Sequence, residues 1–246
     1  GQLSAAFLRE FIVIGARWLA FLLADNLTSS LLHFFPAAVG AAVPYKADCQ
    51  LSVFGAGRAK ESVVLDGARL GQPDGIRLEQ AFPFLKESSS GIFGLEVLID
   101  SHQPRTDLSS SLCVVDLEQQ AGSVRFWARS LPLKPEDGES IPGTGVIVKD
   151  SYATTSLVCV NSSSQSLDLT LPIIGAEPLA LGAVPAGQAV ERAVPEQVFS
   201  AARVQERSWG LARALGCTAP KLSTDQTAYL LYRNAKNQLP LSVIAL

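Results

Sequence analysis

Residues 5–24 read AAFLREFIVIGARWLAFLLA and form the centre of the most apolar part of the chain, residues 3–43. In a helix, five large side chains of this segment would lie close to one side: Phe7, Phe11, Trp18, Phe21 and Leu22. The β-branched run Ile12-Val13-Ile14 and the alternation after it also fit a strand. In either conformation we expect the apolar face to pack in the chain's own core or to dock on a neighbouring subunit.

Charged residues make this apolar stretch a poor membrane span. Arg9, Glu10, Arg17 and Asp25 interrupt every run of about 18 to 20 apolar residues that a spanning helix needs. The uncharged window 26–45 holds two prolines and several polar residues. A secretory signal also fits poorly, because no basic start precedes the apolar part. The chain has no Met, so we interpret Gly1 as a processed or engineered terminus.

The composition predicts a compact protein. Hydrophobic residues make up 48% of the 246 residues and charged residues 17%, which excludes a disordered chain. The net charge is −3 and no basic stripe is present, so we expect no direct sequence readout of nucleic acid. From residue 48 onward, short apolar runs alternate with turn residues, which is typical of a β-sandwich or β-barrel. The predicted strands are 49–55, 61–66, 93–100, 111–118, 123–129, 145–149, 155–161, 166–171, 189–194, 227–233 and 239–246.

Helices are expected only at 78–86 and 195–215, besides the helical alternative for the N-terminal stretch. The segment 131–143 contains three prolines, two glycines and four charged residues, and it is the best candidate for a domain linker. The predicted fold is therefore mainly β, with two tandem antiparallel β-sandwich domains. We expect an apolar N-terminal docking segment at 1–43, the first sandwich at 44–130, the linker at 131–143 and the second sandwich at 144–246.

The two halves share a weak sequence repeat, which suggests an internal duplication. Glu79-Gln80-Ala81-Phe82 resembles Glu196-Gln197-Val198-Phe199, and Phe93-Gly94-Leu95 resembles Trp209-Gly210-Leu211. The alignment then places 112–117 opposite 228–233, and upstream it places 51–54 opposite 157–160. One larger sandwich with similar strands is the alternative.

Four cysteines, Cys49, Cys113, Cys159 and Cys217, lie two in each proposed half. With no Cys-x-x-Cys and only two histidines, we expect no metal site. If disulfides form, Cys49–Cys113 and Cys159–Cys217 are the natural pairs within domains. We favour four free thiols, because the cysteines are not equivalent in the repeat and two of them lie inside apolar strands.

No convincing catalytic set is present in the sequence. The stretch GAGRAKES at 55–62 lacks the Gly-Lys-Ser/Thr end of a phosphate loop, and we interpret it as a hairpin turn. Asp100, Ser101 and His102, with Arg105 and Asp107 nearby, would need a nucleophile elbow that the chain lacks, so a solvated loop is favoured. We expect neither enzyme activity nor a cofactor.

The sequence favours a non-enzymatic structural subunit of a large assembly, such as a coat, surface layer, filament or multi-subunit complex. Its partners would be copies of itself or other subunits, in an extracellular location or an assembled particle. Sheet edges and seven apolar side chains would make the contacts: Phe7, Phe11, Trp18, Phe21, Leu22, Phe34 and Phe35.

The main alternative is a secreted or periplasmic β-sandwich module that binds glycan or protein. It would use an exposed aromatic platform drawn from Phe126, Trp127, Trp209, Tyr229 and Tyr232. An enzyme built around Asp100 and His102 is a third hypothesis.

Overall fold

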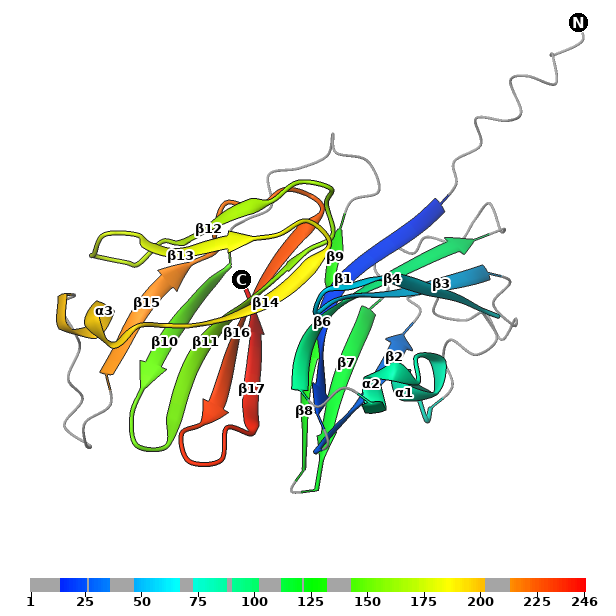
Figure 1. Cartoon of the computed structure of the whole chain (residues 1–246), viewed down its shortest axis with the longest axis horizontal. Coiled ribbons are helices and arrows are strands. Elements are labelled where there is room, and N and C mark those ends of the chain that lie inside the picture. The colour runs from blue at the N-terminus through cyan, green and yellow to red at the C-terminus, as the bar shows by residue number, and fades with distance from the viewer. Residues whose placement is uncertain are drawn as a thin grey trace, which may run out of the picture.

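The computed structural model describes residues 14–25, 27–35, 47–66, 73–87, 90–101, 112–120, 122–131, 143–201 and 213–246. The protein is mainly β, and all pairings between the described strands are antiparallel (Figure 1). We call residues 14–131 the first half and residues 143–246 the second half.

The first half contains nine strands and two short helices. These are β1 (Ile14–Asp25), β2 (Thr28–Phe35), β3 (Ala47–Gly55), β4 (Arg58–Asp66), β5 (Ile76–Arg77), α1 (Leu78–Ala81), α2 (Phe84–Glu87), β6 (Ser90–Ser101), β7 (Leu112–Gln119), β8 (Gly122–Trp127) and β9 (Arg129–Leu131). The sheet order is β4-β3-β6-β1-β2-β7-β8, with β9 on β1 and β5 on β2. Because β1 and β2 are paired only at Asp25 and Thr28, beside their turn, the sheet folds over on itself and becomes sandwich-like.

The second half contains eight strands and one helix. These are β10 (Thr144–Lys149), β11 (Ala153–Asn161), β12 (Leu167–Leu171), β13 (Leu179–Val184), β14 (Gln188–Ala193), α3 (Glu196–Ala201), β15 (Arg213–Thr218), β16 (Gln226–Asn234) and β17 (Pro240–Ala245). The main sheet has the order β15-β10-β11-β16-β17, with β14 on β11. The β12–β13 hairpin joins β15 through a bridge between Ile173 and Cys217.

The strand order is the same in the two halves. The path β6-β1-β2-β7-β8 in the first half corresponds to β15-β10-β11-β16-β17 in the second. The surrounding elements also correspond: β5 lies on β2 as β14 lies on β11, and short helices precede both β6 and β15. The β3–β4 hairpin pairs with β6, as the β12–β13 unit meets β15.

The two halves pack through one continuous hydrophobic core. Strands β11 and β16 have apolar side chains on both faces, and residues 155–161 are all buried. One face of β11 carries Leu157 and Cys159 into the core of the second half. The opposite face carries Val158 and Val160 into the core that contains β1 and β6 of the first half. The halves are therefore held together by buried apolar surface.

Most of the predicted strands after residue 48 are confirmed, with ends that move by one to three residues. The predicted strand 123–129 is β8 followed by β9, and the predicted helix 78–86 is interrupted at Pro83 between α1 and α2. The segment 55–62 is the β3–β4 hairpin, in which Ala56 and Gly57 have φ values of 51° and 75°. This left-handed turn explains why glycine occurs there.

The helix predicted at 195–215 is confirmed at Glu196–Ala201 and is wrong from Arg213 onward. Residues 202–212 lie outside the described residues, and Arg213–Thr218 is β15, which pairs along its whole length with β10. The tertiary pairing decides this conformation, and Gly216 is a poor helix residue in any case. Strand β13, with the sequence LALGAV, was missed because it has few β-branched residues.

The helical interpretation of residues 5–24 is also wrong from Ile14 onward. β1 is a strand that pairs with β6 over all twelve of its residues, from Ile14–Ser101 to Asp25–Ser90. The apolar segment expected at 1–43 therefore corresponds, over 14–25 and 28–35, to two strands of the first sheet. Both faces of β1 are covered, which explains why its apolar pattern also suits a helix.

Gly94 on β6 lies at a close contact between the two halves. A Cβ built on Gly94 would overlap the ring of Phe54 and lie 2.9 Å from Cγ1 of Val160 in the second half. In an uncrowded strand, replacing glycine with alanine removes an entropic cost of about 0.5–1 kcal/mol. Here the crowding at the junction outweighs that gain.

We therefore predict that Gly94→Ala lowers the free energy of unfolding by about 1–3 kcal/mol, as overpacked cores do. Denaturant unfolding followed by fluorescence measures it. Gly91→Ala on the same strand is the control, because its nearest ring atom, on Phe93, lies 3.2 Å from the added Cβ and a smaller loss is expected. Equal stability of Gly94→Ala and the wild type would contradict the close packing at this point.

Candidate assembly surface

The chain itself buries four of the seven side chains expected to make subunit contacts. Trp18, Phe21, Leu22 and Phe34 are each at most 5% exposed and belong to the first hydrophobic core. The Trp18 ring packs edge-to-face on Phe34 at a centroid distance of 5.4 Å. These four side chains are covered because β1 lies inside the sheet and because Phe34 is on the face of β2 that packs into the first core. Phe7 and Phe11 lie outside the described residues.

Phe35 is the described member of that set that stays open to solvent, at 49% exposed. It lies on the face of β2, β7 and β8 that is turned away from the first core. On this face Phe35 is in register with Leu112, which is 46% exposed. One row further along, His33, Val114 and Trp127 are in register; Trp127 is 57% exposed, His33 is partly buried and Val114 is buried, at 2% exposed. We call these five residues the aromatic face.

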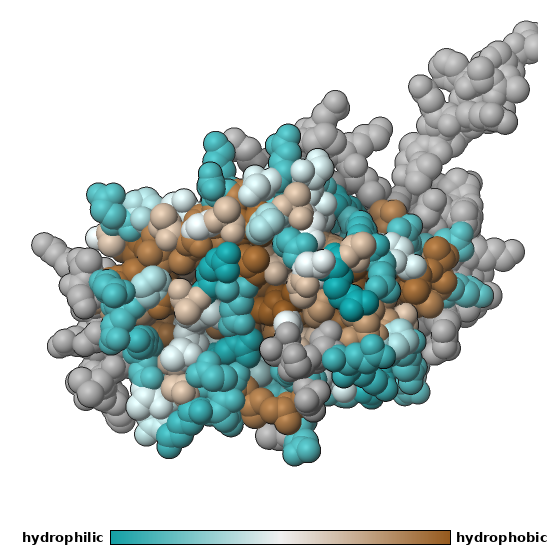
Figure 2. All heavy atoms as spheres, in the orientation of Figure 1, coloured by the Kyte–Doolittle hydropathy of each residue, from teal (hydrophilic) through white to brown (hydrophobic). Residues whose placement is uncertain are grey.

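The side chains of the aromatic face lie next to one another because paired residues of antiparallel strands point to the same side of a sheet. The His33 and Phe35 rings stack at a centroid distance of 6.4 Å with an interplanar angle of 15°. Figure 2 shows that hydrophobic residues also reach the surface among hydrophilic ones elsewhere on the molecule. The aromatic face differs because three large, half-exposed apolar side chains occupy adjacent rows of one sheet.

Ion pairs border the aromatic face along the same strands. Arg125 on β8 donates to Oδ2 of Asp116 from Nη2 at 2.6 Å and from Nε at 3.2 Å. Arg77 on β5 lies 3.3 Å from Glu118 on β7. An apolar centre beside paired charges is the usual arrangement of a protein–protein interface.

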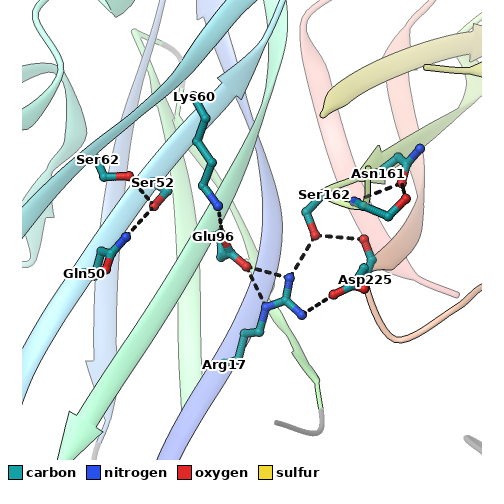
Figure 3. Close-up of polar contacts among 10 residues, drawn as sticks. Arg17, Gln50, Ser52, Lys60, Ser62, Glu96, Asn161, Ser162 and Asp225 are labelled. Atoms are coloured by element: carbon teal, nitrogen blue, oxygen red, sulfur yellow. Dashed lines mark hydrogen bonds and ion pairs between the residues drawn. The ribbon is translucent and has the colours of Figure 1, made fainter. Parts of the chain in front are cut away.

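A polar network crosses the junction of the two halves (Figure 3). Arg17 on β1 donates to Glu96 on β6 at 2.6 Å, to Asp225 at 2.5 Å and to the Ser162 hydroxyl at 2.9 Å. Lys60 on β4 also donates to Glu96. Arg17 therefore joins the first half to two residues of the second.

The charges of this network stabilise one another. Partial burial works to lower the pKa of Arg17, but hydrogen bonding to Asp225 and the attraction of Glu96 outweigh it and raise the pKa above its ordinary value. Burial likewise works to raise the pKa of Glu96, while Lys60 and Arg17 together hold it below its ordinary value. Both groups are thus charged at neutral pH, and the network is part of the junction.

Tyr229 is the central aromatic side chain of the junction and is fully buried. Its hydroxyl donates to the Leu19 carbonyl at 2.6 Å and accepts from the Arg129 amide at 3.1 Å. Its ring lies 5.4 Å from those of Phe21 and Phe126. Burial raises its pKa far above the usual range.

The aromatic residues considered for a sugar-binding platform are therefore separated. Phe126 and Tyr229 are core residues, and Tyr232 is half-buried with its hydroxyl on the Val146 carbonyl. Trp127 is exposed on the aromatic face, and Trp209 lies outside the described residues.

A groove of about 640 Å³ lies at the β1–β2 end of the junction. Its walls include Leu23, Ile92, Glu191 and Arg233. Arg233 binds both carboxylate oxygens of Glu191, at 2.7 and 2.8 Å. Burial works to raise the pKa of Glu191, but Arg233 and a hydrogen bond from Ser156 lower it below its ordinary value. This charged pair is satisfied within the chain.

The four cysteines are free and buried. Burial raises the pKa of Cys49 and Cys159 to about 12 and that of Cys217 to about 11, and it raises that of Cys113 further. None of these thiols is therefore activated as a nucleophile.

The structure does not describe the side chains that the sequence suggested for acid–base chemistry. Asp100 is on β6, but its side chain is outside the described part, as are His102, Arg105 and Asp107. Among the described residues, no group of three or more His, Cys, Asp or Glu is arranged to hold a metal ion. No described helix is long and apolar enough to cross a membrane.

Comparison of the sequence with protein-family models and with curated proteins finds no match.

The aromatic face could not have been found from the sequence, because Phe35, Leu112 and Trp127 are distant along the chain. Only the pairing of β2 with β7 and of β7 with β8 brings them together. Alternation within each strand indicates that one face is exposed, but not which strands are neighbours.

We predict that Tyr229→Phe lowers the free energy of unfolding by about 1–3 kcal/mol, because it removes the hydroxyl that pairs a buried amide and a carbonyl. Tyr232→Phe is the matched control: its hydroxyl makes one bond, at 2.6 Å to Val146, near the surface, and a smaller loss is expected. Chemical denaturation of both variants tests the difference. A larger loss for Tyr232→Phe would contradict the assigned role of Tyr229.

We also predict that Ellman's reagent at pH 8 finds no reactive thiol in the native protein and four after unfolding without reductant. The raised thiol pKa values and burial both suppress reaction in the folded state. Protein unfolded with reductant gives the reference count. Fewer than four thiols in the unreduced, unfolded protein would reveal a disulfide.

Proposed function

We propose that the protein is a non-enzymatic structural subunit that assembles with other protein chains through its aromatic face. The observation that carries the proposal is the set of three half-exposed apolar side chains in adjacent rows: Phe35, Leu112 and Trp127. Clusters of this kind on a soluble protein mark interaction sites. Trp is also the side chain that most often dominates interface energies.

The fold suits such a role, since a sheet supports the surface rigidly. The aromatic face rests on β2 and β7, whose opposite faces pack into the first core through Leu32, Phe34, Cys113 and Val115. Side chains held on strands lose little conformational freedom when they are covered. Of the contact residues proposed from the sequence, Phe35 is therefore the one among the described residues that can still contact a partner.

We further propose that the two halves are duplicated β-sandwich units. The shared strand order supports this proposal, and so does the position of α1 and α3 before β6 and β15. By strand order, however, β11 corresponds to β2, whereas the sequence alignment placed 157–160 opposite 51–54 in β3. The match between 51–54 and 157–160 therefore reflects the similar apolar content of β3 and β11, which occupy different positions in their sheets.

Binding of a glycan at the aromatic face is the second candidate function. Trp127 and the stacked pair of His33 and Phe35 offer flat rings on either side of the buried Val114. In that case the protein would stay monomeric and would act as a secreted or periplasmic module that binds glycan. An extracellular location or an assembled particle remains a prediction in both cases.

We predict that the wild-type chain self-associates as its concentration rises, and that the double variant Phe35→Ser/Trp127→Ser weakens this at least about tenfold in Kd, the effect of removing one strong contact residue. Sedimentation velocity measures the association. Tyr152→Ser is the control, because Tyr152 is 75% exposed but lies in the β10–β11 turn. A chain that stays monomeric at every concentration and binds a glycan array through Trp127 would replace the assembly role with the module role.

A further inference from the structure

The two halves of the chain are joined head to tail. The face of β14, β11, β16 and β17 that is turned away from the second core packs on β1, β3 and β6 of the first half, and β17 also contacts β8. In the first half, the elements that correspond to this covering face are β5, β2, β7 and β8, and their outward face carries the aromatic face. In the second half, β10 and β15 correspond to β1 and β6. The junction thus joins two different surfaces. The first half still has the outward face of β5, β2, β7 and β8, which corresponds to the covering face of the second half. The second half still has the outward face of β10 and β15, which corresponds to the part of the first half that is covered at β1 and β6.

The covered surface in the first half has a distinctive local arrangement. Phe54 on β3 is in register with Gly94 on β6, and its ring lies over this glycine. Val160 of the second half packs on the same spot, and Phe54 is 2% exposed. The missing side chain of Gly94 makes room for both.

The second half has the same arrangement, but nothing among the described residues covers it. Ile174 follows the Ile173–Cys217 bridge, donates its amide to the Gly216 carbonyl at 2.9 Å, and lies over Gly216. A Cβ on Gly216 would be 3.0 Å from Cδ1 of Ile174. Ile174 is 60% exposed, and so the counterpart of the buried Phe54 faces solvent.

Val146 extends this exposed surface. It lies on β10 in register with Gly216 of β15, and it is 47% exposed. We call Val146, Ile174 and Gly216 the Val146–Ile174 face. In Figure 1, β10 and β15 lie at the left side of the molecule, away from β1 and β6, so this face is separate from the junction.

We propose that a second copy of the chain covers the Val146–Ile174 face with its aromatic face, as the second half covers the first half within one chain. This inference rests on the proposed function and names the partner and the mode of contact. Because the two surfaces differ, the contact is heterologous, and each copy that docks presents a new free surface. Repetition of the contact gives a filament, or a ring if the rotation between copies closes.

A second copy fits better than an unrelated partner because the chain carries both surfaces and already contains one contact of the same kind. The charged pair beside the aromatic face is also satisfied within the chain, because Arg125 is bound to Asp116. When the apolar side chains are covered, these charges therefore keep their partners. A buried charge that has lost its partner would destabilise the contact strongly.

Mixing two single variants tests the proposal. Trp127→Asp disables the aromatic face and leaves the Val146–Ile174 face intact, while Ile174→Arg does the reverse. We expect each variant alone to self-associate at least about tenfold more weakly than the wild type. An equimolar mixture should form a one-to-one dimer that grows no further, because only one good contact remains. Sedimentation velocity and light scattering measure the masses.

Controls separate folding from binding. Both positions are more than half exposed, so the unfolding midpoints should match that of the wild type, and Trp127→Ser and Ile174→Ser repeat the test if either charge disturbs folding. The double variant in one chain should be monomeric and should not dimerise with itself. Tyr152→Ser should assemble like the wild type.

The outcomes distinguish this inference from the proposed function. If Trp127→Asp blocks assembly but Ile174→Arg assembles normally, the aromatic face binds a different surface: the inference fails and the assembly role stands. The same holds if both variants are blocked but the mixture forms no dimer. A wild-type chain that is monomeric at every concentration overturns both.

Discussion

The structure depends on the burial of β11 and β16 on both faces. An antiparallel strand usually has one apolar and one polar face, whereas a strand covered on both sides is apolar throughout. Residues 155–161 are buried without interruption, and they serve two cores in alternation. A shift of one residue in the register of β11 would exchange Leu157 and Cys159 with Val158 and Val160. The register of this strand therefore determines the second core and the junction together.

The polar groups at the junction fix the relative orientation of the two halves. Apolar contact alone would allow the halves to slide, but Arg17 reaches Asp225 and Ser162 in the second half while it is bound to Glu96 in the first. The hydroxyl of Tyr229 adds a fixed point at the backbone of β1. Ion pairs such as Arg17–Asp225 contribute little net stability because of their desolvation cost, and their larger effect is on orientation. Gly94 completes the arrangement, since it allows the two sheets to come within contact distance.

The sequence predicted most strands after residue 48, but it did not predict how the strands are arranged. The central runs 157–160 (LVCV) and 228–232 (AYLLY) are apolar or aromatic and are followed by turn residues, so the strands at 155–161 and 227–233 could be predicted. β1 was ambiguous because a strand with two apolar faces has no period-2 signal to separate it from a buried helix. β15 follows from its pairing with β10, which a propensity argument for 195–215 does not contain. The repeat near Glu79 and Glu196 was detectable, but its extension to β3 and β11 required strand order to correct it. The aromatic face is a product of pairing between distant strands.

Covalent linkage explains why the internal junction and the exposed surfaces differ in character. Two halves of one chain meet at a high effective concentration, so a large, fully buried contact around Tyr229 forms without competing with other molecules. A contact between separate chains has no such advantage, and a surface as apolar as the junction would aggregate before it found its partner. The solvent-facing apolar side chains of the aromatic face and of the Val146–Ile174 face are each 46–60% exposed, and the Arg125–Asp116 pair lies beside the aromatic face. In the proposed assembly, this moderate surface keeps the free chain soluble and makes association depend on the concentration of the protein.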